Sequence, residues 1–305
     1  MSNQSFWHRT VPVETLCIYR IGVGVIIADD VLNWLPYSRE LFSSEGFHIG
    51  HWSNLAPPPI LAFLLCGLLF IFCCMIALGV YTKSIILLTW FLLAYLIGID
   101  SIYEKAVFTI HLVVLAFLLL SDCSAKFSLD RFLSKRHRPP EDKSTTCIFA
   151  QRLLQVYFAQ TYFFCALVKM MNPQWVYQQA LLLILQGRWS NDWGVWFTGW
   201  LPPLFIRGVC LGVFLFEILA PFLLFVAGAR RWMIALGVVF HLANHLLLNI
   251  ETLSFHFVWA LLILYPESGH VAKTVREMRR SLMERKEIRN MLKYAERVRM
   301  AREMD

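Results

Sequence analysis

The sequence carries little charge for its length. Asp, Glu, Lys and Arg make up 16% of its 305 residues, while hydrophobic residues make up 58% and aromatic residues 15%. A typical soluble domain has roughly 25% charged residues, which keep its surface hydrated. The apolar residues are also concentrated in blocks of roughly 17–25 residues, the length that crosses a hydrocarbon core about 30 Å thick. These features exclude an ordinary soluble protein and indicate a polytopic membrane protein.

Metal-binding motifs are also lacking. The eight cysteines include no CxxC pair and lie mostly in apolar runs, so we interpret them as small buried hydrophobic residues. The nine histidines are fewer than a di-iron membrane hydroxylase needs. We therefore expect no metal.

The N-terminus lacks the charged, apolar and small regions that follow one another in a cleaved signal peptide. Residues 1–12 form a polar segment instead, and we expect the first apolar span to remain as a membrane anchor.

Eight apolar segments predict eight transmembrane helices, because backbone groups in lipid must form their hydrogen bonds within their own segment. The expected spans are approximately 13–35, 59–80, 84–101, 105–121, 147–170, 203–227, 231–250 and 252–266. The predicted fold is an all-α, polytopic membrane helix bundle over residues 13–266. Residues 174–202, between spans five and six, are rich in tryptophan and interrupted by Gly and Pro, which is typical of a re-entrant or interfacial segment.

Basic residues are distributed unevenly among the expected loops. With eight spans, both termini lie on the same side as the loops after spans two, four and six. Those three loops hold nine Lys and Arg, against three in the other loops. The positive-inside rule therefore predicts a multi-pass protein of the inner or plasma membrane with cytoplasmic termini.

The C-terminal residues 267–305 hold eleven Lys and Arg against seven Asp and Glu, and they contain no Gly or Pro after Gly269. A weak apolar stripe at helical spacing is formed by Val275, Met278, Leu282, Met291, Ala295 and Val298. We interpret this tail as a charged cytoplasmic helix that lies on the anionic leaflet, or alternatively as a helix that docks a protein partner. Nucleic-acid binding is not expected, because the membrane topology explains the basic excess.

Several ionisable side chains fall inside the expected spans, where a charge costs at least about 2.5–3.5 kcal/mol. Arg20 either reaches the headgroups or faces the bundle interior. At least one of the adjacent Asp29 and Asp30 should face the interior, and we select Asp30. Glu217 lies near the middle of span six. His111 in span four is either a hydrogen-bonded core residue or a reactant.

Span seven is the richest in polar side chains. His241, His245 and Asn249 follow one another at i, i+4 and i+8 and therefore share a helical face, and Asn244 lies beside them. Two histidines without a third clear ligand make a weak metal site. We favour a polar seam that packs against Glu217.

Lys169 ends span five in the stretch YFFCALVKMMNPQW, residues 162–175. A lysine at a helix end often anchors the helix by reaching the headgroups. The positive-inside rule makes a lysine on the outer side unusual, however. The alternative is a base held where water is scarce.

These segments together resemble the horizontally transferred transmembrane (HTTM) domain family, whose best-known member is vitamin K-dependent gamma-carboxylase. YFFCALVK followed by Trp175 resembles the family's Tyr-Phe…Lys segment, and FHLANHLLLNIETLS resembles its Phe-His-x-x-Asn segment. HLVVLAFLLLSDCSAKFSLD, FEILAPFLLF and RIGVGVIIADDVLNWLPYSRELFSSEG also match in order. The resemblance covers residues 10–266. It departs from the family in the gap between Lys169 and Trp175, which is one residue longer, and at Glu251, where a glycine is expected.

The resemblance implies that Lys169 is the catalytic base and His111 its partner, and that His241, Asn244 and His245 line the pocket. It also implies a reduced vitamin K or menaquinol-type quinone as cofactor, with O2 and CO2, and a glutamyl peptide substrate on the extracytoplasmic side. The chain would then be a carbon–carbon lyase and quinol epoxidase. The large extramembrane part of the carboxylase has no counterpart in the charged tail, so substrate capture is not implied.

Two other functions stay open. One is a non-catalytic membrane factor for the maturation, export or immunity of a secreted peptide. The other is a proton-coupled transporter that uses Asp29 or Asp30, Glu217 and His241, although the sequence shows no paired repeats of hydrophobic segments.

Overall fold

The computed structural model describes residues 6–48, 52–99, 106–134, 144–267, 269–278 and 280–284. The structure is 76% helical, which confirms a mostly α-helical fold. One helix coincides with each of the eight expected spans. These are α1 (Glu14–Trp34), α3 (Pro59–Leu78), α4 (Thr82–Ile99), α5 (Ala106–Leu119), α7 (Phe149–Met170), α11 (Pro203–Leu223), α12 (Ala227–Leu247) and α13 (Glu251–Ile263).

Shorter elements connect these helices. They are η1 (Leu35–Tyr37), α2 (Ser38–Phe42), η2 (Ser53–Leu55), α6 (Leu129–Ser134), α8 (Pro173–Val176), α9 (Ala180–Leu185) and α10 (Asp192–Thr198), with the strands β1 (Thr10–Pro12) and β2 (Thr145–Cys147). The strands pair antiparallel with Val11 opposite Thr146. This pairing was not predicted from the sequence, because strands of three residues are too short to show an alternation of apolar and polar side chains.

Four of the helices, α3, α4, α7 and α11, are long and apolar enough to cross a membrane. Their outward faces suit lipid: Ile60, Leu64 and Ile71 of α3 are all more than half exposed. Helices α5 and α13 are apolar but shorter. Helices α1 and α12 are 21 residues long but are interrupted by charged or polar side chains. The chain is therefore a membrane protein, and the eight crossings stay a prediction.

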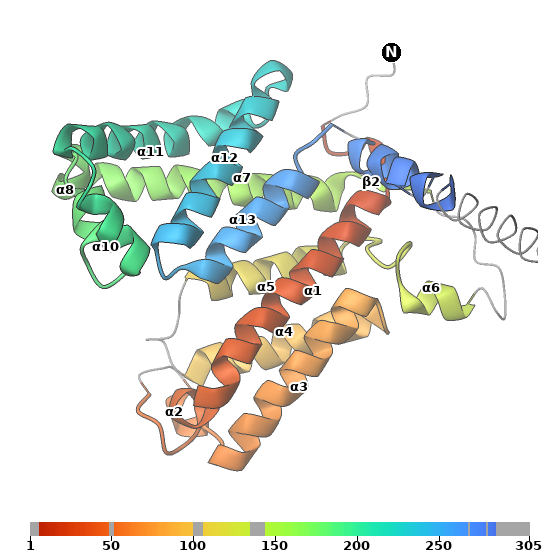
Figure 1. Ribbon diagram of the computed structural model, residues 1–305. Coiled ribbons are helices and arrows are strands. Elements are labelled where there is room, and N and C mark those ends of the chain that lie inside the picture. The colour runs from red at the N-terminus through yellow and green to blue at the C-terminus, as the bar shows by residue number, and fades with distance from the viewer. Residues whose placement is uncertain are drawn as a thin grey trace, which may run out of the picture. The chain divides into compact units, whose positions relative to one another are not determined.

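The long helices reverse direction one after another, which gives the bundle two ends (Figure 1). At the sheet end, which comprises residues 9–13, 79–81, 120–134, 144–148 and 224–226, Ile148 N–H donates to Arg9 O and Tyr81 N–H to Asp130 Oδ1. At the tryptophan end, which comprises residues 35–48, 52–58, 171–202 and 248–250, Asn249 N–H donates to Trp189 O. The sheet end thus holds the loops that the sequence places on one side. Which side of the membrane it faces stays a prediction.

Arg20 helps to close the sheet end. Its side chain is fully buried, and Nη2 donates to the carbonyl oxygen of Phe127 at 2.6 Å. Beside it, Lys126 Nζ lies 2.7 Å from Glu14 Oε1. Arg20 therefore faces the bundle interior and holds the loop after α5 against α1.

The segment expected to be interfacial forms three short helices, α8 to α10. Helix α7 ends before Asn172-Pro173, because a residue before proline disfavours helical backbone. Asn172 then caps α8 by accepting a hydrogen bond from Gln174 N–H, and Asn191 caps α10 in the same way. The α10 residues Trp193 and Trp196 are more than half exposed, as in the aromatic belts of membrane proteins.

The chain divides after Pro266, and Glu267–Asp305 is a separate compact unit. Residues 270–278 and 280–284 of this tail are helical, and Met278 and Leu282 are exposed. Val275 of the expected stripe is half-buried. The remaining stripe residues Met291, Ala295 and Val298 lie outside the described residues.

Helix α1 packs on α3 (Figure 1), and Gly24 lies in this contact. A Cβ atom there would lie 2.7 Å from Ala77 N and 2.9 Å from Cys73 O. Both are backbone atoms, which can move away only if helix α3 itself shifts. We expect Gly24→Ala to destabilise the bundle by about 1–3 kcal/mol. Thermal unfolding followed by a thiol-reactive dye measures this, since several cysteines are buried and free.

Gly67→Ala is the matched control, because it adds the same methyl group to a helix with no neighbouring atom within 4 Å. Its midpoint should stay unchanged or rise slightly. Equal midpoints for the two variants would contradict the packing of α1 on α3.

Candidate functional site

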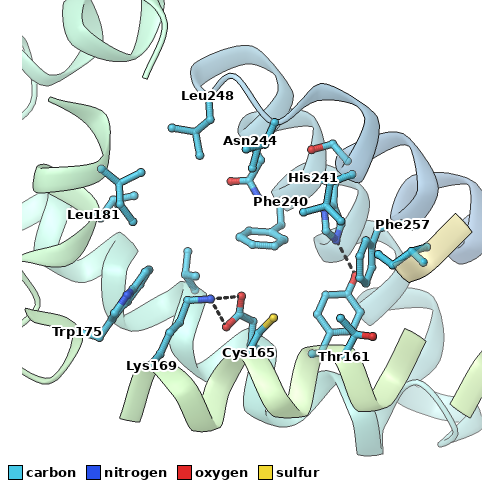
Figure 2. A pocket seen from close by; sticks show the side chains of 18 of the residues that line it. Thr161, Cys165, Lys169, Trp175, Leu181, Phe240, His241, Asn244, Leu248 and Phe257 are labelled. Carbon is cyan, nitrogen blue, oxygen red and sulfur yellow. Dashed lines mark hydrogen bonds and ion pairs between the residues drawn. The ribbon is translucent and has the colours of Figure 1, made fainter. Parts of the chain in front are cut away.

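A cavity of about 520 Å³ lies between helices α7, α11, α12 and α13, toward the tryptophan end (Figure 2). Much of its wall is apolar or aromatic, and includes Leu181, Ile184, Val213, Phe240, Leu248 and Phe257. The polar lining residues are Thr109, Tyr157, Thr161, Tyr162, Lys169, Glu217, His241, Asn244 and Ser254. The site is therefore a mostly apolar chamber with a few convergent polar groups, as ligand sites usually are.

Lys169 and Glu217 both line this cavity and form an ion pair, which Figure 2 marks with dashed lines from Lys169. Both carboxylate oxygens lie 2.5 Å from Nζ. The side chains are 17% and 5% exposed, so the pair is largely shielded from solvent. The ammonium also lies 4.8 Å from the centroid of the Trp175 ring, a cation–π arrangement. The lysine thus turns inward rather than out toward headgroups.

A second polar pair joins α7 to α12. Tyr162 Oη and His241 Nε2 are 2.7 Å apart, and the His241 ring stacks on Phe257 with centroids 4.6 Å apart and planes at 17°. Tyr162 and Lys169 are seven residues apart and share a face of α7, which places their Cα atoms about 10 Å apart along the helix. The cavity therefore has polar groups at two places along one wall.

The other expected span-seven residues separate. Asn244 lines the cavity beside His241. His245 is not among the lining residues, and its ring lies 4.7 Å from that of Phe255. Asn249 Nδ2 donates to Ser190 O and so fixes the loop after α9. Glu217 lines the same cavity as His241 and Asn244, and its ion-pair partner is Lys169.

His111 lies in a different polar cluster, behind the cavity wall. Its Nε2 is 3.7 Å from Asp30 Oδ2, and its ring centroid is 4.7 Å from that of His256. Asp30 Oδ1 accepts a hydrogen bond from Thr252 at 2.8 Å. Both imidazoles are fully buried, and none of their nitrogens has a hydrogen-bond partner in the part of the chain that the structure describes. The structure therefore does not bring His111 to the ammonium of Lys169.

The cluster still adjoins the cavity. Ile110, next to His111, and Ser254, two residues before His256, are both lining residues. Asp30 is buried whereas Asp29 is exposed, so the prediction that one of these two carboxylates faces inward is confirmed.

Three site residues were missed in the sequence. His256 gave the same signal as His111, an imidazole in an apolar run, but in the shortest expected span. Tyr162 and Trp175 belong to the segment that resembles the family but were given no role of their own, because aromatic residues are common throughout the chain.

No group of three or more His, Cys, Asp and Glu side chains that could hold a metal ion occurs within the described ranges. The chemistry that the cavity offers is proton transfer. An amine and a carboxylate in contact can exchange a proton with each other and with a bound molecule, and a water-poor chamber strengthens such interactions.

Comparison with known proteins identifies one protein family that matches the chain. The model of the HTTM domain matches residues 8–268. No curated protein and no solved structure matches the chain.

Removing one member of the ion pair should destabilise the bundle, because the other charge is left in a mostly apolar chamber. We expect Glu217→Ala to cost about 3 kcal/mol, and the double variant Lys169→Met/Glu217→Leu to recover most of that loss. The midpoint of thermal unfolding in detergent measures both.

The control is Glu277→Gln, which breaks the pair that Glu277 forms with Lys273 on the tail, where both side chains are more than 60% exposed. Its midpoint should not move, since exposed pairs contribute little. A Glu217→Ala midpoint that also stays in place would show that the pair is not formed.

Proposed function

Because the chain belongs to the HTTM domain family, we propose that it is a membrane enzyme that uses a reduced quinone to drive carboxylation of a glutamyl peptide. The observation that carries the proposal is the inward position of Lys169. A cation held by a carboxylate on the wall of a mostly apolar cavity is costly, and such groups in membrane proteins are usually functional.

The cavity suits a quinone by size and by lining. Sites for small molecules and cofactors are typically about 300–1,000 Å³ and mostly apolar, and this cavity measures about 520 Å³. Phe240, Phe257 and Trp175 offer aromatic surface for a planar ring, and Lys169, Asn244 and Tyr162 offer polar contacts for its oxygen atoms. When bound, a vitamin K or menaquinol-type reduced quinone with O2 supplies a base strong enough for a glutamyl side chain to lose a proton and add CO2.

Lys169 would hold and move the first proton. Transfer of a proton from Nζ to a carboxylate oxygen of Glu217 leaves a neutral amine and a neutral acid, which a poorly hydrated site favours over two separate charges. The neutral amine can then accept a proton from a bound hydroxyl group. Glu217 therefore acts through Lys169, by accepting its proton. The net charge of the pair changes only when the neutral amine accepts the proton of the bound hydroxyl group.

The remaining site residues would stabilise negative charge on the bound molecule or position the residues that contact it. Tyr162, held by His241, can donate a hydrogen bond to an oxygen atom that gains negative charge, and Asn244 can do the same. His111 would act indirectly, by fixing Asp30 and the α1–α5–α13 contact behind the cavity, as a positioning residue. His245 has no proposed contact with the ligand.

The proposed orientation places the tryptophan end, and the cavity near it, on the outer side of the cell membrane. The uneven distribution of basic residues supports this, because the loops of the sheet end hold most of them. A peptide substrate would then meet the site from outside. A non-catalytic factor for a secreted peptide is the main alternative, and it requires no proton transfer in the cavity.

The test is an assay of purified protein in nanodiscs with vitamin K hydroquinone or menaquinol, O2, labelled CO2 and a glutamyl peptide. We expect quinone epoxide and labelled peptide from the wild type. Lys169→Ala should lower both at least about 100-fold, the usual contribution of a general base. His111→Ala should also lower both, by a smaller factor.

Lys83→Ala is the control, because Lys83 is an exposed lysine in the first turn of α4 outside the cavity, and its activity should match the wild type. No epoxide from the wild type with any of these reduced quinones would exclude the enzyme and leave the non-catalytic factor and the proton-coupled transporter.

A further inference from the structure

Three arginines from separate segments meet at the sheet end. Arg9 precedes strand β1, Arg152 lies in the first turn of α7, and Arg230 lies in the first turn of α12. We call them the arginine cluster. Arg9 and Arg230 are near enough for their charges to act on Arg152. The main chain of Arg9 is fixed against α7, because its carbonyl oxygen accepts a hydrogen bond from Ile148 N–H at 2.9 Å.

Aromatic rings connect two members of the cluster. The guanidinium of Arg152 lies 4.1 Å from the centroid of the Phe6 ring, and this ring lies 6.0 Å from that of Phe225. Arg230 Nη2 donates to the carbonyl oxygen of Phe225 at 3.2 Å. A continuous series of contacts thus runs from Arg152 to Arg230 across the ends of three helices.

The positive charges of Arg152 and Arg230 are not neutralised by the described part of the chain. Among the described residues, Arg152 bonds only to the neutral Gln155, and its Nε is buried without a partner. Within the same residues, Arg230 bonds only to carbonyl oxygens. Neither α7 nor α12 has an acidic residue in its first turn. The N-terminus of a helix carries partial positive charge, so cations are unfavourable there and anions are favourable.

The positive-inside rule accounts for basic residues in these loops. It does not account for two guanidinium groups at two helix N-termini, linked through Phe6, because scattered residues such as the exposed Arg231 satisfy the rule equally well. An external anion would be favoured by the guanidinium groups and by both helix dipoles together.

We propose that the arginine cluster binds the phosphate group of an anionic membrane lipid. The chemistry that it recognises is a phosphate, which guanidinium groups bind through two parallel hydrogen bonds. Exposed apolar side chains beside the cluster, among them Phe6, Phe149, Phe222 and Val226, favour a ligand with acyl chains over a free phosphate. Basic pockets between helices on the cytoplasmic side bind headgroups in this way. The proposal is independent of the enzymatic function proposed above.

The test measures lipid binding by native mass spectrometry of the full-length protein titrated with phosphatidylglycerol or phosphatidylcholine. We expect phosphatidylglycerol to bind about tenfold more tightly. Arg152→Gln and Arg230→Gln should each weaken it about fivefold, which corresponds to roughly 1 kcal/mol per basic residue. Glycerol phosphate and inorganic phosphate form a separate arm, and neither should displace the lipid at equal concentration.

Arg231→Gln is the matched control. It removes the same charge from the next position of α12, where the guanidinium lies 5.3 Å from the Trp232 ring and is exposed. Its binding should stay within about twofold of the wild type. Phosphatidylglycerol should also raise the thermal midpoint of the wild type and of Arg231→Gln, which reports on the site in folded protein.

Three results would overturn the proposal. Equal binding of the two lipids would show that no anion site exists. An equal loss for Arg231→Gln and Arg152→Gln would show general attraction of the basic surface to anionic lipid. Displacement by inorganic phosphate at equal concentration would show a site for free phosphate.

Discussion

The contact between Lys169 and Glu217 is the constraint on which the rest of the site depends. Either charge alone in a hydrocarbon environment costs several kcal/mol, and each is retained because the other lies beside it. The pair joins the last turn of α7 to the middle of α11, so these helices must lie side by side with their polar faces inward. The cavity then forms where α12 and α13 cover this pair, and its polar and apolar parts follow from that arrangement.

The buried histidines show a second consequence of placing polar groups in lipid. Nε2 of His241 has a hydrogen-bond partner in Tyr162, and the ring stacks on Phe257. The ring nitrogens of His111 and His256, in contrast, have no hydrogen-bond partner among the described residues. An unsatisfied buried polar atom costs about 1–3 kcal/mol, and apolar residues of similar shape would avoid that cost. The cluster adjoins the cavity, because Ile110, next to His111, and Ser254, two residues before His256, both line it.

The two ends of the bundle differ in chemistry. The tryptophan end carries short helices, exposed aromatic rings and the cavity, whereas the sheet end carries the small sheet, the buried Arg20 and the arginine cluster. Because successive helices run in opposite directions, the loops after even-numbered spans lie at one end of the bundle and those after odd-numbered spans at the other. Differences in composition between these two sets of loops therefore become differences between two surfaces. The described basic residues of the even loops, such as Lys126 and Arg131, thus lie at the sheet end.

The sequence by itself determined the membrane environment, the positions of the eight main helices and the inward direction of one of the two adjacent aspartates. The helix positions could be predicted from the sequence because backbone groups in lipid form their hydrogen bonds within their own segment, so each apolar run coincides with a helix. The tertiary structure alone decided which polar groups meet. Glu217 lines the same cavity as His241 and Asn244, but its ion pair with Lys169 was not predicted. His111 was expected beside Lys169 but lies with Asp30 and His256. Spacing within a helix fixes only which residues share its face, whereas the rotation and neighbours of each helix result from packing along its whole length.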